Sequence, residues 1–233
     1  GIYMIPAEDR LDSVSNMCDR AHMAKDYIED EYVQPYAIFD QKMGSSYMER
    51  NDALRDISNA LEKHEFQVYY QPVYDAFSGE IASAEALVRW KKADGEMVSP
   101  GIFVPALEDS GRISQMDLFV ERSVLSFMEE RYKKGQFIVP VSMNMSQMDF
   151  FDKDMMASVL LDVSNTDLPM DYTRFEVTET AYSIVASNNR NVLLDMKRIG
   201  VKFYLDDFGS GYSSFSTIRD YDFDVVKLDM GFV

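Results

Sequence analysis

Cysteine and positive charge are both scarce in this sequence. Its 233 residues contain a single cysteine, Cys18, which excludes a disulfide framework and argues against a cysteine-rich zinc site. Lys and Arg number 23 against 40 Asp and Glu, so the formal net charge is −17. Because a nucleic-acid-coating protein needs a basic face to neutralise phosphates, we expect no nucleic-acid partner. A small phosphorylated ligand remains compatible if metal ions or local cations balance its charge.

Long apolar runs are also lacking. The longest, such as 137–141, fall far below the roughly 20 residues that a membrane helix needs. No basic-then-apolar signal segment opens the chain. The hydrophobic content of 46% nevertheless suffices for a packed core. Both ends lie in apolar runs, so we expect a fragment of a longer protein.

The first forty residues predict a strand, a helix and a strand. Apolar residues recur at helical spacing over 11–28, and short strand-like runs flank them at 3–5 and 32–39. About 40 residues are too few for an independent core, so we interpret this piece as the end of an earlier domain. A polar stretch, 40–51, then leads to a connecting helix predicted over 53–63.

The main domain is predicted to open with a β-hairpin. Strand-like runs at 68–73 and 81–90 are separated by the turn-rich link 75–79. A link this short joins antiparallel neighbours. Folding the chain at the link places Gln71 opposite Glu85.

Strands and helices alternate after this hairpin. The helices are predicted over 113–134, 155–163, 182–199 and 213–219, and the strands over 137–143, 174–177, 201–205 and 223–228. This alternation is typical of parallel strands covered by helices. We therefore expect an α/β fold in which six strands of the main domain form part of a β/α barrel.

Polar side chains recur at the ends of these strands. Asn144, Glu176 and Asp206 are spaced about 30 residues apart, which is the length of one βαβ unit. Three more polar residues lie in or just after the predicted strands: Glu179, Asp207 and Lys227. The carboxyl ends of barrel strands meet on one face, so these side chains should converge there.

Carboxylates gathered in this way need cations. Glu85 belongs to the cluster because it stands in the apolar run 84–87, where an unpaired charge is costly. Oxygen ligands select hard ions such as Mg²⁺, Mn²⁺ or Ca²⁺, and the adjacent Asp206 and Asp207 suit a pair of metals. Lys227 could assist the attacking water or hold phosphate charge. The residues therefore indicate metal-assisted hydrolysis of a phosphoester.

Simpler interpretations remain open for two of these features. An Asp-Asp pair at a strand end is more often a helix cap or a turn. Lys227 could simply pair with Asp229.

Seven short motifs connect the chain to a known family. They are Tyr-Tyr-Gln-Pro at 69–72, Glu-Ala-Leu-Val-Arg-Trp at 85–90, Ser-Pro-Gly-Ile-Phe-Val-Pro at 99–105, Met-Asn-Met-Ser at 143–146, Phe-Glu-Val-Thr-Glu-Thr at 175–180, Leu-Asp-Asp-Phe-Gly-Ser-Gly-Tyr-Ser-Ser at 205–214 and Val-Lys-Leu-Asp at 226–229. In order and spacing they resemble the EAL family of cyclic di-GMP phosphodiesterases. The first 43 residues resemble, more loosely, the C-terminal end of a GGDEF domain.

The resemblance implies a TIM-like (β/α)8 barrel with one antiparallel strand that hydrolyses cyclic di-GMP to linear pGpG with Mg²⁺ or Mn²⁺. By motif, Glu85, Asn144, Glu176 and Asp206 would bind one metal, and Asp206 with Asp207 would help to bind the second. Lys227 would touch the water or metal site. Gln71, Leu87 and Arg89 would contact the ligand. Glu179 would brace the loop 208–214, which in the family couples the site to dimerisation, so a homodimer is expected.

The expected organisation is a GGDEF remnant at 1–43, a linker helix at 44–64 and an EAL domain at 65–233. Two further family motifs would lie beyond Val233, so about six of eight barrel strands are expected here, and the isolated chain could be inactive. The alternative function is a catalytically inactive receptor for cyclic di-GMP. The nucleotide substrate and the missing export signal favour the cytoplasm, with membrane contact only through an N-terminal part absent from this chain.

Overall fold

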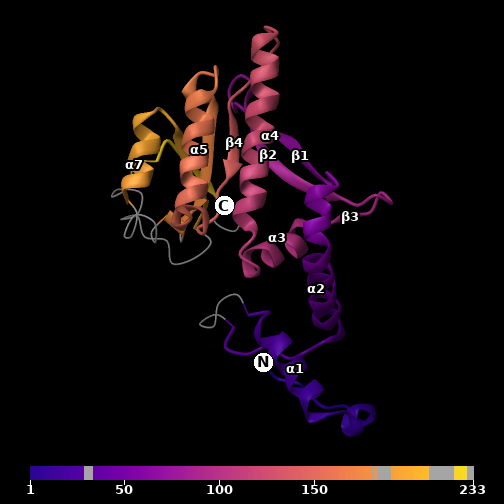
Figure 1. Ribbon diagram of the computed structural model, residues 1–233. Helices are drawn as coiled ribbons and strands as arrows, with labels where there is room; N and C mark the ends of the chain where they lie inside the picture. The colour runs from indigo at the N-terminus through magenta and orange to yellow at the C-terminus, as the bar shows by residue number, and fades with distance from the viewer. Residues whose placement is uncertain (29–33, 180, 183–189, 210–222, 230–233) are drawn as a thin grey trace.

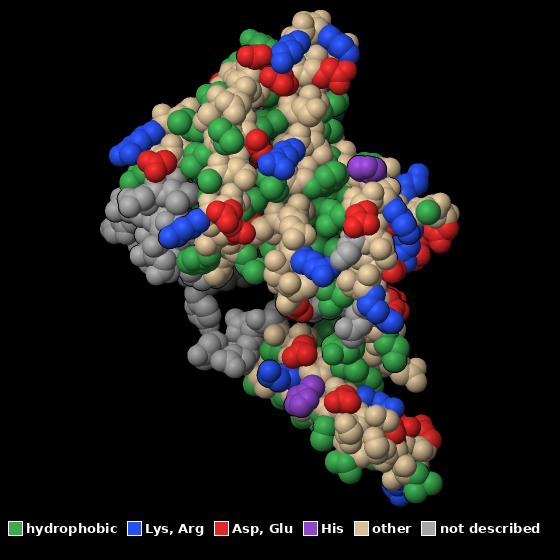
Figure 2. Space-filling model, viewed as in Figure 1, with side chains coloured by type: hydrophobic (Ala, Val, Ile, Leu, Met, Phe, Trp, Pro, Cys, Tyr) green, Lys and Arg blue, Asp and Glu red, His purple; other side chains and the backbone are tan. Residues whose placement is uncertain are grey.

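The computed structural model describes residues 1–28, 34–179, 181–182, 190–209 and 223–229. Its strands form one sheet in the order β1-β2-β4-β5-β6-β7, with the short β3 (Met97–Val98) paired to β2. In Figure 1 the long helices α4 and α5 stand beside this sheet, and the N-terminal segment with α1 extends away from it along α2. Acidic and basic side chains are interspersed over the face shown in Figure 2. No helix within the described ranges is long and apolar enough to cross a membrane.

The sheet begins with the expected hairpin. β1 (Phe66–Tyr74) and β2 (Ile81–Lys91) are antiparallel, and Gln71 lies opposite Glu85 as predicted. The turn forms because Asp75 Oδ1 accepts hydrogen bonds from the backbone N–H groups of Phe77 and Ser78 at 3.0 and 2.7 Å. Gly79 follows with φ +72°, a conformation that glycine adopts without strain.

The next strands are parallel and alternate with helices. Four strands follow: β4 (Val141–Asn144), β5 (Thr173–Thr178), β6 (Lys202–Phe208) and β7 (Val225–Leu228). β4 pairs in parallel with β2, and β5, β6 and β7 each pair in parallel with the strand before them. The intervening helices are α4 (Ile113–Lys133), α5 (Lys153–Asn165) and α7 (Arg190–Arg198). Two 3₁₀ turns, η2 (Asp149–Phe151) and η3 (Met170–Tyr172), complete the connections. The alternation predicted from the sequence is therefore confirmed from β4 to β6, whereas the helix predicted between β6 and β7 lies outside the described residues.

One strand of the parallel set is shorter than predicted. The sequence suggested a strand over 137–143, but β4 starts only at Val141. Pro140 has no N–H to donate to a ladder, although its carbonyl accepts from the Ala84 N–H at 3.0 Å. Phe137 is 70% exposed, so the residues before Pro140 run outside the sheet.

The N-terminal expectations are only partly met. The predicted strand at 3–5 is absent, and an isolated bridge joins Ile2 to Ile38 instead. Pro6 is followed by the 3₁₀ helix η1 (Ala7–Leu11), and α1 (Val14–Lys25) is shorter than the predicted 11–28 because Ser13 caps it. Of the second predicted strand, 32–33 lie outside the described residues, and 34–39 contain only the bridge at Ile38.

The polar stretch before the main domain is helical, contrary to expectation. α2 (Gln41–Glu62) begins at Asp40, whose Oδ1 accepts from the Met43 N–H at 2.8 Å. This cap starts the helix a dozen residues earlier than its apolar periodicity suggested. α3 (Pro100–Asp109), which we did not predict, packs against α2. Of the predicted helix 182–199, the part 183–189 lies outside the described residues, as does the whole predicted helix 213–219.

An aromatic cluster joins α3 to the hairpin. The rings of Phe66, Trp90 and Phe103 are buried, with centroids 5.2 to 5.9 Å apart. Trp90 Nε1 also donates a hydrogen bond to Glu65 Oε2 at 3.0 Å. The cluster fixes the far end of β2, the strand whose middle carries Glu85.

Candidate active site

The site is built on strands rather than on loops. Glu85 lies in the middle of β2, where its backbone is placed between Gln71 of β1 and Ser142 of β4. Asn144 ends β4 and lies in register with Glu176 of β5. The predicted convergence of these strands places their polar side chains on one end of the sheet.

The ammonium group of Lys227 lies at the centre of this cluster. Its Nζ is 3.0 Å from Glu85 Oε2, 2.5 Å from Glu176 Oε2 and 3.2 Å from Asp206 Oδ2. These contacts join β7 to β2, β5 and β6, which are up to 142 residues apart in sequence. The alternative pairing of Lys227 with Asp229 is therefore not its main contact.

The charges of the cluster do not balance. Burial raises the pKa of Glu176, although its hydrogen bond with Lys227 opposes that rise. Burial alone would lower the pKa of Lys227, but the hydrogen bond and charge of Glu176, with those of Glu85 and Asp206, raise it above its ordinary value. Lys227 therefore stays protonated at neutral pH. Three carboxylates around one ammonium leave an excess of negative charge.

Two further predicted ligands adjoin the cluster. Asn144 Nδ2 donates to Glu85 Oε1 at 3.3 Å. Asp207 has φ +54°, and its N–H donates to Asp206 Oδ1 at 3.0 Å. Burial and the charges of Asp206 and Asp229 raise the pKa of Asp207. The left-handed backbone turns Asp207 away from the direction that a continuous strand would give it.

The donor chemistry fits a hard divalent cation. The cluster supplies carboxylate oxygens and one amide, the donor set that Mg²⁺ and Mn²⁺ prefer, and it has spare negative charge. In the part of the chain that the structure describes, no three His, Cys, Asp or Glu side chains surround a common metal position. The carboxylates face the ammonium of Lys227 instead.

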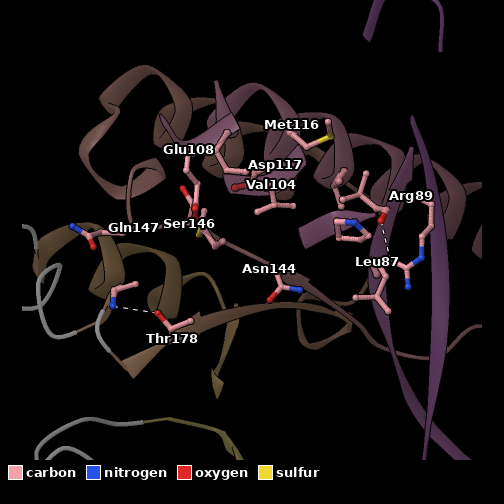
Figure 3. A pocket seen from close by; sticks show the side chains of 17 residues that line it. Leu87, Arg89, Val104, Glu108, Met116, Asp117, Asn144, Ser146, Gln147 and Thr178 are labelled. Atoms are coloured by element: carbon pink, nitrogen blue, oxygen red, sulfur yellow. Dashed lines mark hydrogen bonds between the residues drawn. The ribbon is translucent and has the colours of Figure 1, made fainter. Parts of the chain in front are cut away.

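A cavity of about 490 Å³ adjoins the cluster at Asn144. Leu87 and Arg89 of β2, two of the three residues expected to contact a ligand, line it, and in Figure 3 they lie at the opposite end from Asp117 and Ser146. Its volume falls within the roughly 300–1,000 Å³ that is typical of small-molecule sites. The cavity can therefore hold part of a ligand whose reacting bond lies near the carboxylates.

Two other predicted residues lie outside this cavity. Gln71 is exposed on β1 and is not among the cavity-lining residues. Glu179 follows β5 and does not line the cavity either. Most of the loop that it was expected to brace, from 210 onwards, lies outside the described residues.

The acidic wall of the cavity was not predicted from the sequence. Asp117 of α4 lines it together with Ser146, and the buried Asp149 of η2 lies behind them. A signal was available, because Asp117 and Glu121 are four residues apart on the face of α4 that buries Val124 and Met128. Carboxylates on such a face indicate a special environment.

Comparisons with known proteins agree with this geometry. The EAL domain family model matches residues 54–233. Over its full length the chain is 28% identical to the bifunctional diguanylate cyclase/cyclic di-GMP phosphodiesterase MucR of Pseudomonas aeruginosa, of which it covers 34%. It is 31% identical over 180 residues to the probable cyclic di-GMP phosphodiesterase PdeB of Escherichia coli, a match that covers 76% of this chain and 34% of the relative. The chain thus spans about a third of these curated relatives.

Solved structures of EAL domains are similar in fold to this chain. The PaMucR phosphodiesterase in complex with c-di-GMP superposes with a TM-score of 0.68 and 28% identity, covering 77% of this chain and 73% of that one. An EAL domain of FimX, at 18% identity, matches in fold with a TM-score of 0.68. The sheet, parallel apart from β1 and the short β3, is accordingly that of a TIM-like barrel. The chain belongs to the EAL domain family.

Proposed function

We propose that this chain is the phosphodiesterase part of a longer bacterial signalling protein and that it hydrolyses cyclic di-GMP to linear pGpG with Mg²⁺ or Mn²⁺. One observation carries the proposal: carboxylates from β2, β5 and β6 meet on Lys227 beside a ligand-sized cavity. The names of the relatives MucR and PdeB support the substrate.

Each side chain of the cluster has a proposed role. Glu85, Asn144, Glu176 and Asp206 would hold one cation, and Asp206 with Asp207 would help to hold a second. When bound, such a pair of ions stabilises the charge on the attacking and leaving oxygens of a phosphoester displacement. Glu176 suits this role because its side chain is almost fully buried, so that water has little access to its oxygens.

The basic side chains near the cavity would bind the phosphate groups. Lys227 would orient the water or hold phosphate charge, since its ammonium stays protonated. Arg89 lines the cavity and offers a guanidinium to a phosphate oxygen, with Leu87 packing against the ligand and Gln71 contacting it from β1. Glu179 would act indirectly by bracing the loop after β6. The positive charges of Lys227 and Arg89 would offset the repulsion between an anionic ligand and a chain of net charge −17.

The domain assignment is part of the proposal. Residues 1–43 would end a GGDEF domain, 44–64 would connect, and 65–233 would form the EAL domain, although the family match begins at residue 54, within α2. The name of MucR, a bifunctional diguanylate cyclase to which the whole chain aligns, supports the first part. We propose a cytoplasmic site of action and a homodimer formed through the barrel.

Glu85→Ala tests the catalytic proposal. We expect it to abolish pGpG formation from cyclic di-GMP, followed by chromatography with Mn²⁺ and with Mg²⁺, because it removes a ligand held between two strands. Glu80→Ala is the matched control, since Glu80 is exposed at the other end of the same hairpin. EDTA should stop turnover.

Three outcomes of this assay would contradict the proposal. Retained turnover in Glu85→Ala would remove Glu85 from the site. Turnover in EDTA would refute the metal requirement. Tight binding of cyclic di-GMP without product in the unaltered protein would favour the alternative, a receptor.

A further inference from the structure

Two carboxyl groups lie together at the cavity wall, one half-buried and one fully buried. Asp117 of α4 lines the cavity, and Asp149 of η2 lies against it with no exposed surface. Asp149 Oδ2 accepts from the Ser146 N–H at 2.8 Å. Asp149 Oδ1 has no hydrogen-bond donor within the described part of the protein. The fold thus places an unpartnered carboxyl oxygen beside a second carboxyl group.

Elementary chemistry decides how the two groups coexist. An ionised carboxylate only accepts hydrogen bonds, so two of them in contact repel, whereas a single proton between them forms a hydrogen bond. Two carboxyl groups sharing one site therefore do not both ionise near neutral pH. Burial is the largest influence on both groups and raises the pKa of each.

The other charged groups around the pair do not replace that proton. Glu108 of α3 faces Asp117, and its charge raises the pKa of Asp117 further, while the backbone of Ser146 opposes this. The hydroxyl of Ser114 partly stabilises the ionised form of Asp149. In Figure 3, Glu108 and Ser146 lie close to Asp117, and Arg89 lies at the far end of the cavity. The charged residues that start α5, at 152–154, are exposed to water.

We propose that Asp149 is a positioning residue that holds Asp117 in the cavity wall through one shared proton, so that the pair carries one negative charge at neutral pH and two at higher pH. The effect of this proton on ligand binding rests on the proposed function, because cyclic di-GMP brings two phosphate charges into the cavity. Losing the shared proton adds a charge of the same sign to the wall. Affinity for the ligand should therefore fall as the pH rises through the upper titration of the pair.

Infrared spectroscopy tests the shared proton directly. All proteins carry Glu121→Gln, because Glu121 is also buried and keeps a proton. At pH 7 we expect the carbonyl stretch of a protonated carboxylic acid in this parent and its loss from the difference spectrum in both Asp149→Asn and Asp117→Asn. Glu108→Gln is the control and should keep the band, because it removes a neighbouring charge and leaves the pair intact.

The spectra can refute the proposal in two ways. An unchanged band in Asp149→Asn would show that Asp149 shares no proton. A band that disappears when Mg²⁺ is added would show that the pair binds a cation instead. Circular dichroism on each variant confirms that it is folded, and the two Asn substitutions, made at different elements, guard against the misfolding of either one.

Calorimetric titration with cyclic di-GMP tests the consequence. Since one proton is coupled to binding, the Kd of the unaltered protein should rise by up to about tenfold per pH unit above the upper titration of the pair. Asp149→Asn should remove this dependence, which a merely structural role would not do. An equal slope in both proteins would overturn the proposal. If cyclic di-GMP does not bind at all while the infrared band is present, the proposed function fails and the shared proton stands.

Discussion

Glu121 is expected to make the protein less stable as the pH rises. It lies on α4 with only 2% of its surface exposed, and neither carboxylate oxygen has a hydrogen-bond partner in the described part of the chain. Burial, followed by the charge of Asp162, raises the pKa of Glu121 from 4.5 to about 8, although Arg122 partly opposes the rise. The folded protein therefore holds a proton that the unfolded chain has already released.

The size of the effect follows from this pKa. Each pKa unit corresponds to ~1.4 kcal/mol, so the rise is equivalent to about 5 kcal/mol at most. Because the folded-state pKa of this acid is raised, the stability is fully present below pH 4.5 and is lost progressively up to about pH 8. Glu121→Gln imitates the protonated side chain and cannot ionise. It should add little stability at pH 4.5 and about 3 kcal/mol at pH 7.

Urea denaturation at pH 4.5, 6, 7 and 8 measures this difference. The free energy of unfolding of Glu121→Gln minus that of the unaltered protein should increase with pH while the m-value stays constant. Glu130→Gln is the control, because Glu130 lies on the same helix but is exposed and paired with Lys134. A difference that does not change with pH would show that Glu121 ionises freely and would refute the reasoning.

Two further predictions concern single residues. Lys227→Met should lower the kcat for cyclic di-GMP about 10²–10³-fold, because it removes the charge that Glu176 contacts. The control Lys153→Met, at an exposed position, should leave kcat unchanged. An unchanged kcat in Lys227→Met would exclude Lys227 from the chemistry. Gly200→Ala should destabilise the fold by about 1–2 kcal/mol in thermal unfolding, because Gly200 has φ +99° and an added Cβ would lie 3.0 Å from Met170 Cβ. An unchanged melting temperature would contradict the steric argument.

Regular spacing along the chain predicted this structure best. The register of Gln71 with Glu85 followed from a short link, and a short link has few ways to close. The cluster around Lys227 followed from the spacing of βαβ units, which fixes where successive strands end. The short link restricts the hairpin register, and the repeat of the βαβ unit aligns the strand ends, although the partner of Lys227 remained open.

Other features depend on contacts that no local pattern contains. The polar residues 41–51 form helix because Asp40 caps it and α3 packs against α2, and α3 is itself too short for a clear periodicity. Likewise, the proximity of Asp117 to Asp149 arises where η2 packs on α4, 32 residues apart in sequence. A carboxylate on an apolar helix face indicated an unusual environment for Asp117, but only the folded structure shows that Asp149 lies in the same environment.

The place of Glu85 between two strands has a consequence for the proposed binding of a cation. With β1 on one side and β4 on the other, the backbone of Glu85 is ordered once the sheet has formed. A carboxylate on a loop would lose conformational freedom when a cation arrives, whereas Glu85 has already lost that freedom during folding. Release of the cation from Glu85 would then be linked to separation of the hairpin from β4. Variants that loosen the hairpin far from the site should therefore also weaken the proposed hold on the ion.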